Sequence, residues 1–148
     1  DHGTVIYGKK SKILQNLHDV TQRIRFNTHS GFICIDPDDI FYCEADGNYC
    51  FIYLPKQRRE CVTLKIGHVQ RLLPGRSFMR AGRSIVININ TLLRYDKKKK
   101  TIELEKDGES LILEAPSGFK KDYESFMRQK SELHVDSLEL TSEIQSYR

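Results

Sequence analysis

The chain has 148 residues, of which 39% are hydrophobic and 30% charged, a balance typical of one globular domain rather than a fibrous or disordered protein. No apolar stretch is long enough for a transmembrane helix and no signal peptide opens the sequence, so we expect a cytoplasmic protein with no membrane contact in this segment. The first residue is not methionine, and we therefore expect the chain to be a piece of a longer protein.

The net charge of +4 is unevenly distributed along the chain. Between Lys56 and Lys100 there are 13 basic and two acidic residues, which gives this segment +11 and leaves −7 for the rest. Such an excess predicts one concentrated positive field and a phosphate polymer as the partner. The alternative is a solvated surface whose cations are balanced by carboxylates that lie near in space.

The predicted elements begin with a helix over residues 10–23, where apolar side chains recur at helical spacing. From Ile24 onward, short runs of Ile, Val, Phe and Tyr alternate with turn residues, as strands do. The strands that this pattern predicts cover residues 24–27, 32–35, 40–45, 49–54, 59–64, 78–80, 84–88, 91–96, 101–105 and 110–114. A short helix over 66–73 ends before Pro74, and a second helical pattern follows Pro116.

About ten short strands without a strand–helix–strand rhythm predict an all-β fold, a sandwich of small antiparallel sheets with flanking N- and C-terminal helices. We expect three parts: a linker helix over 1–23, the β-rich domain over 24–124, and a tail over 125–148 that is helical or partly disordered.

No constellation of residues predicts an enzyme, a metal site or a cofactor. The histidines are scattered, and no nucleophile elbow, phosphate loop or dinucleotide fingerprint is present. Asp36, Asp38 and Asp39 are expected to form a turn and a cap rather than a cation site. The cysteines lack zinc-ligand spacing and stand in strand-like runs, so we expect small buried hydrophobes at Cys34, Cys43, Cys50 and Cys61.

Two arginines stand close together around Gly82, in a tight connection between predicted strands. A guanidinium held on such a loop can clamp a phosphate or bind the edge of a guanine. For Arg83 this pattern favours contact with nucleic acid. For Arg80, which has apolar neighbours, an equal alternative is pairing with an acid such as Glu44, which would only stabilise the loop.

Several motifs together resemble the LytTR family of bacterial DNA-binding domains, over about residues 24–123. They are Ile40–Ala45 with Asn48 and Tyr49, the short helix over Leu64–Leu73, and then Phe78, Arg80, Arg83, Ser84 and Val86–Asn88. The resemblance implies an elongated sandwich of three small β-sheets, with about ten strands. It also implies transcriptional control by a domain that reads DNA with loops instead of a recognition helix.

The family's DNA-facing loops correspond here to Asp46–Tyr49, the loop with the two arginines, the hairpin Lys97–Lys100 and the connection Pro116–Lys120. The DNA-contacting residues that the resemblance implies are Asn48, Tyr49, Arg80, Arg83, Lys97, Lys98, Lys99, Lys100, Ser117 and Lys120. Two alternatives stay open: Asn48 can simply be the left-handed residue of its turn, and the four lysines can be a solvated hairpin tip.

The sequence departs from the family pattern at two places. Gly82 stands where many members carry His, and Ala115–Gly118 replaces a segment in which many members have a Ser-Arg pair. We therefore expect weaker base reading at that end, with Lys120 and Lys121 supplying non-specific affinity.

The leading interpretation is a sequence-specific regulator that binds double-stranded promoter DNA as a homodimer on paired sites. It would be the output domain of a bacterial signalling system, such as a two-component response regulator, and not an enzyme. One alternative is a protein-interaction module whose basic face docks an acidic partner. Another is single-stranded nucleic-acid binding by Tyr49, Phe51 and Tyr53, although alternate residues of one strand are more simply explained as core or sheet surface.

Overall fold

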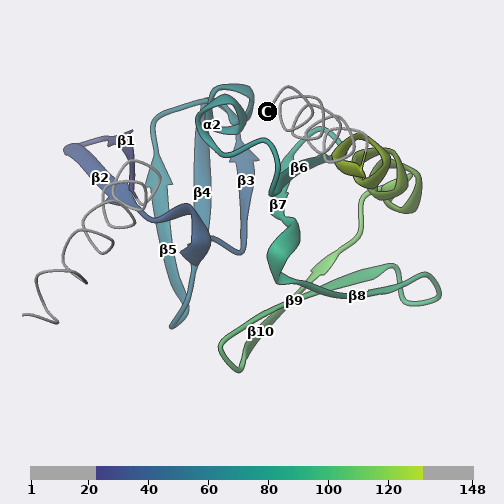
Figure 1. Cartoon of the computed structure of the whole chain (residues 1–148). Helices are drawn as coiled ribbons and strands as arrows, with labels where there is room; N and C mark the ends of the chain where they lie inside the picture. Colours follow the sequence, from purple (N-terminus) through teal and green to yellow (C-terminus); the bar gives the residue numbers. More distant parts are fainter. Residues whose placement is uncertain (1–22, 132–148) are drawn as a thin grey trace, which may run out of the picture.

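A computed structural model of the chain describes residues 23–131, in which ten strands form three antiparallel sheets (Figure 1). This confirms the predicted fold of about ten strands in small antiparallel sheets. The predicted helix over 10–23 lies outside the described residues except for its last residue, and so does the tail from residue 132 onward.

The strands are β1 (Ile24–Thr28), β2 (Gly31–Ile35), β3 (Tyr42–Asp46), β4 (Tyr49–Leu54), β5 (Arg58–Val62), β6 (Phe78–Ala81), β7 (Ile85–Asn88), β8 (Leu92–Asp96), β9 (Thr101–Lys106) and β10 (Glu109–Glu114). The helical segments are the helix α2 (Ile66–Leu72), the 3-10 turns η1 (Pro37–Asp39) and η2 (Ile89–Thr91), and a helix described over 119–131, here called the C-terminal helix. The C-terminal helix continues across the predicted boundary between residues 124 and 125.

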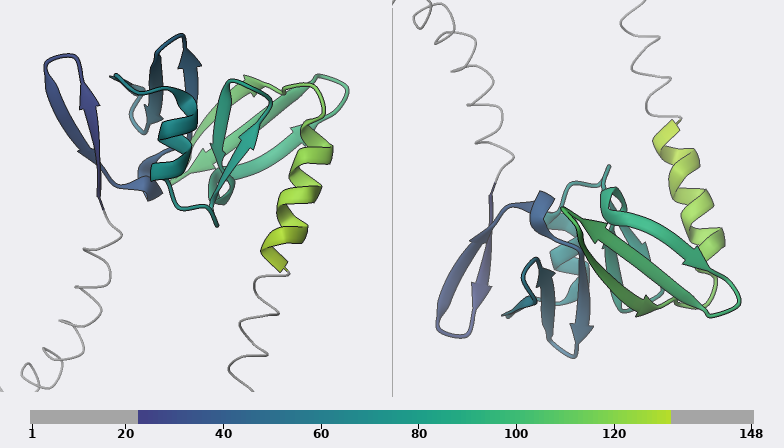
Figure 2. Two further views of the ribbon diagram at one scale, coloured as in Figure 1. Left: turned by 90° about the horizontal axis from the view of Figure 1, so that it is seen from above. Right: turned by 90° about the horizontal axis from the view of Figure 1, so that it is seen from below.

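The three sheets follow one another across the molecule, with β1 and β2 at one side and β8 to β10 at the other (Figure 2). The central sheet has the order β5-β4-β3-β7-β6, and the third sheet has the order β10-β9-β8. Most connections are tight hairpins. Asp107 and Gly108, for example, join β9 to β10 with φ angles of 51° and 83°, as a type I′ turn requires.

Both faces of the central sheet are covered, because its side chains alternate between two cores. Cys43 and Ile52 on one face pack under α2 and the first hairpin, which contribute residues such as Val69. Ile87 on the other face packs against the third sheet, which contributes Ile102. The central sheet thereby fixes the positions of the loops at its ends.

Only two of the four cysteines are buried. Cys43 and Cys50 lie in the core as predicted, and burial is the main cause that raises the pKa of Cys50 to about 11. The prediction was wrong for Cys34 and Cys61, which are exposed. The reason for Cys61 is strand alternation, which turns its neighbour Val62 into the core and Cys61 outward.

The third sheet is attached to the central sheet at the end where the β4–β5 and β9–β10 turns lie. The carboxylate of Glu109 accepts a hydrogen bond from the backbone N–H of Lys56 at 2.8 Å. The ammonium of Lys106 lies 3.4 Å from the carboxylate of Asp39. Next to it, the side chain of Asp36 accepts from the backbone of Asp38 at 2.9 Å and caps η1, which confirms the predicted turn and cap.

Candidate nucleic-acid interface

Four loops that are far apart in the sequence are joined in series by contacts. The backbone N–H of Ala45, beside the β3–β4 turn, donates to the carbonyl of Ser84 at 2.8 Å. Gly82 of the same β6–β7 loop packs on Pro116. The N–H of Ala115, which precedes Pro116, donates to the carbonyl of Lys100 at 2.8 Å. We call residues 46–49, 82–84, 97–100 and 116–120 the loop strip.

The β3–β4 turn presents two of the predicted site residues. Gly47 holds the left-handed backbone with φ +62°, while Asn48 does not, so the alternative role of Asn48 as the left-handed residue was wrong. A glycine at the first central position of a two-residue hairpin is typical of a type II′ turn. Asn48 is exposed, and Tyr49 keeps 47% of its surface accessible. Both side chains are therefore available to a ligand.

Arg80 supports the β6–β7 loop from inside. It lies on the face of the central sheet that packs under α2, where Nη1 donates to Oε1 of Gln70 at 3.0 Å. Nη2 donates to the backbone carbonyl of Arg83, three residues further on. The expected acidic partner is not involved, because Glu44 accepts instead from the hydroxyl of Tyr53 at 3.4 Å. These contacts hold the β6–β7 loop, as the loop-stabilising alternative for Arg80 expected, but through Gln70 and a backbone carbonyl instead of an acid.

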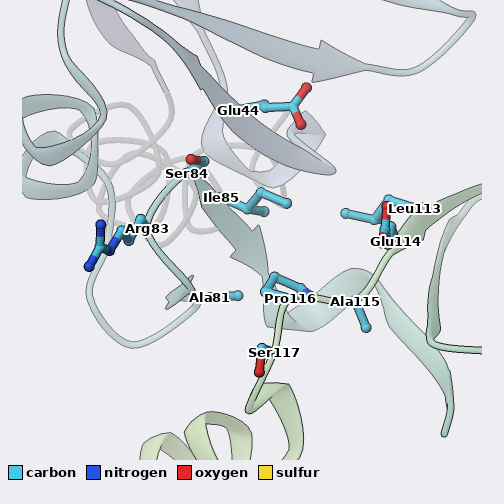
Figure 3. Close-up of a pocket in the computed structure, with 10 residues that line it drawn as sticks. All are labelled: Glu44, Ala81, Arg83, Ser84, Ile85, Leu113, Glu114, Ala115, Pro116 and Ser117. Carbon is cyan, nitrogen blue, oxygen red and sulfur yellow. The ribbon is translucent and has the colours of Figure 1, made fainter.

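Arg83 is the exposed arginine of this loop. Arg83 and Pro116 both line the pocket between the central and third sheets, and the guanidinium of Arg83 points away from the other lining side chains (Figure 3). Gly82, just before it, has φ +65°, and a Cβ atom there would lie 2.9 Å from Cβ of Pro116. The two departures from the family pattern thus meet in space, and the absence of a side chain at residue 82 leaves room for the proline ring.

The four lysines form the β8–β9 turn, which Asp96 stabilises. Oδ1 of Asp96 accepts from the backbone N–H of Lys99 at 3.0 Å, and Lys100 adopts φ +57° where the chain enters β9. All four lysine side chains, Lys97 to Lys100, are exposed. The two ion pairs within residues 23–131 are Arg94–Glu103 and Lys106–Asp39, so these lysines and Arg83 have no carboxylate partner there.

The last loop of the strip leads into the C-terminal helix. Phe119 is buried and its ring lies 5.2 Å from that of Tyr95, which anchors the start of the helix on β8. The neighbouring Ser117 and Lys120 are exposed. Of the ten predicted site residues, Arg80 alone is held inside, and the other nine are exposed along the strip.

The sequence predicted that the basic segment 56–100 forms one concentrated positive field. In the structure, its cations are instead divided between different ends of the central sheet. Arg58 pairs with Leu54 at the far end of β4, whereas Asn48 precedes the other end of this strand. Lys56 therefore lies away from the strip, beside Glu109. Two cations that were not predicted as site residues also lie near the strip: Lys65 and Arg71 line a groove with Asn48, together with the imidazole of His68. The only signal for them was their place in the basic segment.

Other classes of site find less support in the described part of the chain. The ring of Phe51 lies under the guanidinium of Arg59, and Tyr53 stacks on Tyr42 with 4.2 Å between ring centroids, so these aromatic rings have partners within the sheet. No three His, Cys, Asp or Glu residues within 23–131 are grouped as metal ligands would be. No helix in the same range has the length and apolar character needed to cross a membrane.

Comparisons with known proteins agree with this fold. No curated protein matches the chain. Among solved structures, the LytTr DNA-binding domain of a protein from Bacillus cereus, described as a methyl-accepting/DNA response regulator, is similar with a TM-score of 0.54. It shares 20% sequence identity, covers 72% of this chain and is itself covered to 96%, which shows a common fold. The family model of the LytTr DNA-binding domain matches residues 30–115. Because this match spans more than half of the chain, the protein belongs to the LytTR family of DNA-binding domains.

Proposed function

We propose that this chain binds double-stranded promoter DNA with sequence preference through the loop strip, and so acts as the transcription-regulating output domain of a bacterial signalling protein. The observation that carries the proposal is the series of contacts that joins the four loops while leaving their cations exposed and without carboxylate partners in residues 23–131. Membership in a family of DNA-binding domains supports it.

The side chains of the strip suit two different tasks. The lysines of the β8–β9 turn, Lys97 to Lys100, and Lys120 would neutralise backbone phosphates, which gives affinity without sequence preference. Arg83 would hydrogen-bond a guanine edge and Asn48 an adenine edge, because their planar groups match these donor and acceptor patterns. Arg80 would act as a positioning residue that holds the backbone of Arg83.

Two further parts of the proposal concern assembly and location. Each loop strip would cover one half-site, so that two protomers bind paired sites, and the stoichiometry on a promoter duplex tests this. Contact with bacterial promoters would place the protein in the cytoplasm.

Binding to promoter fragments, measured by fluorescence anisotropy at several salt concentrations, tests the proposal. The parent chain should lose affinity steeply with salt and still prefer particular fragments. Arg83→Ala should reduce the preference between fragments by about 1–3 kcal/mol. Replacing all four lysines of the β8–β9 turn with Ala should weaken binding to every fragment and lower the salt slope by up to about 3.6, or 0.9 per phosphate.

The control variant is Arg58→Ala, because Arg58 is exposed at the end of the central sheet away from the strip. It should bind like the parent. If the Arg83 and lysine variants also bind like the parent, the assignment of the strip is wrong. If the parent shows no preference among fragments but captures an acidic protein, the chain is instead a protein-interaction module.

A further inference from the structure

A groove continues the loop strip beyond Asn48. It is lined by Asn48 itself, by the connection from β5 to α2 and by the first two turns of α2. In Figure 1, α2 lies at the same end of the central sheet as the β3–β4 turn. The groove therefore lies beside one terminal loop of the strip.

The groove is cationic because of the way α2 packs. Ile66 and Val69 turn one side of the helix into the core. His68 and Arg71 are three residues apart, so their side chains share the solvent-facing side of the helix, and Lys65 is the exposed N-cap residue just before it. All three are exposed and all three line the groove.

The groove also lacks negative charge. No carboxylate is among its lining residues, and neither ion pair within residues 23–131 involves Lys65 or Arg71. Side chains of a helix lean toward its N-terminus, and Arg71 accordingly reaches back over Gly67, where a Cβ atom on the glycine would lie 3.9 Å from Nη1. The guanidinium of Arg71 therefore lies beside the entry to the helix.

We propose that Lys65, His68 and Arg71 form a flanking clamp that holds backbone phosphates of duplex DNA outside the segment contacted by Asn48. The inference rests on the proposed function and extends its footprint at one end. Its support is charge complementarity and the shared residue Asn48, which belongs to both the groove and the strip. Contacts of this kind add affinity and salt dependence but no sequence preference.

The clamp is tested with two duplexes that contain the same preferred site. One ends at the edge of that site, and the other extends by about half a helical turn on each side, or about five base pairs. The full-length parent should bind the longer duplex more tightly. The double variant Lys65→Ala/Arg71→Ala should lose this advantage, bind the shorter duplex like the parent and keep the parent's preference among fragments.

The salt dependence gives a second measure. Loss of two phosphate contacts should lower the salt slope on the longer duplex by about 1.8, so that an increase from about 50 to 200 mM salt weakens the variant roughly tenfold less than the parent. The matched control is Arg58→Ala/Arg76→Ala, which removes the same charge from exposed positions away from the groove. It should retain the parent's advantage on the longer duplex.

Two results would overturn the clamp in different ways. If Lys65→Ala/Arg71→Ala matches the control variant in affinity and salt slope on both duplexes, while the parent binds DNA, the clamp is refuted and the proposed function stands. If the parent binds neither duplex, the proposed function fails and the clamp fails with it. Circular dichroism of each variant checks that the fold is intact.

Discussion

Substituting Gly82 with Ala tests the packing that joins the central sheet to the last loop of the strip. Gly82 has φ +65°, a backbone conformation that costs a non-glycine residue about 1–2 kcal/mol. The added Cβ would also lie 2.9 Å from Cβ of Pro116, which is too close for two carbon atoms. Because the ring of Pro116 is rigid, backbone must shift to relieve this contact.

The expected loss of stability is the sum of these two effects. Overpacking of this kind destabilises by about 1–3 kcal/mol, so Gly82→Ala should lower the free energy of unfolding by roughly 2–5 kcal/mol. In a domain of this size, that corresponds to a melting temperature lower by roughly 8 °C or more. Urea denaturation of the full chain, followed by circular dichroism, measures the free energy directly.

Gly47 provides a control with a similar positive φ but no crowding. Its φ is +62°, and a Cβ atom there would meet no atom within 4 Å. Gly47→Ala should therefore lose only the backbone part, about 1–2 kcal/mol. In addition, Pro116→Gly in the Gly82→Ala background should recover the steric part. Equal losses for Gly82→Ala and Gly47→Ala, with no recovery, would refute the packing argument.

Three further predictions concern the core, the lysine turn and pH. Asn88→Ala should lower the free energy of unfolding by about 2–4 kcal/mol in urea denaturation, because buried Asn88 donates to the carbonyl of Ile40 at 2.9 Å and the loss leaves that acceptor unpaired. Asp96→Ala should speed hydrogen exchange at the amide of Lys99, which loses its 3.0 Å acceptor, and should lower stability by about 0.5–1.5 kcal/mol. Burial raises the pKa of Cys50 from 9.0 to about 11, so the unfolded chain releases this proton first; stability should fall as pH rises from 9 to 11, and fall less in Cys50→Ala.

Much of the fold could be predicted from the sequence because its signals are local. Side chains of β9 and β10 alternate along the strand, and Ile102 and Leu104 are buried as that pattern predicts. The turn residues Asp107 and Gly108 adopt the left-handed angles that their chemistry favours. The exposure of the lysine turn also follows from local sequence, since four consecutive lysines at a hairpin tip have no core to enter.

The features that the sequence analysis missed depend on contacts between distant segments. The partner of Arg80 is Gln70, and this pairing exists only because α2 packs over the strand that carries Arg80. The cations of the basic segment lie apart because successive turns of an antiparallel sheet alternate between its two ends. Lys56 is therefore at the opposite end of β4 from the turn at Asn48. A count of charges along the chain predicts neither the packing of α2 over Arg80 nor the separation of Lys56 from Asn48.

The third sheet is fastened to the central sheet at two separate places. At one end Gly82 packs on Pro116, and at the other the carboxylate of Glu109 binds the backbone of Lys56. These two attachments, with the core around Ile87 and Ile102 packed between the sheets, resist the twisting or hinging of one sheet against the other. The spacing between Arg83 and the lysine turn is consequently fixed by the fold. In the proposed complex, a bound duplex would have to bend or rotate to match this fixed spacing, so its flexibility would become part of what the domain selects.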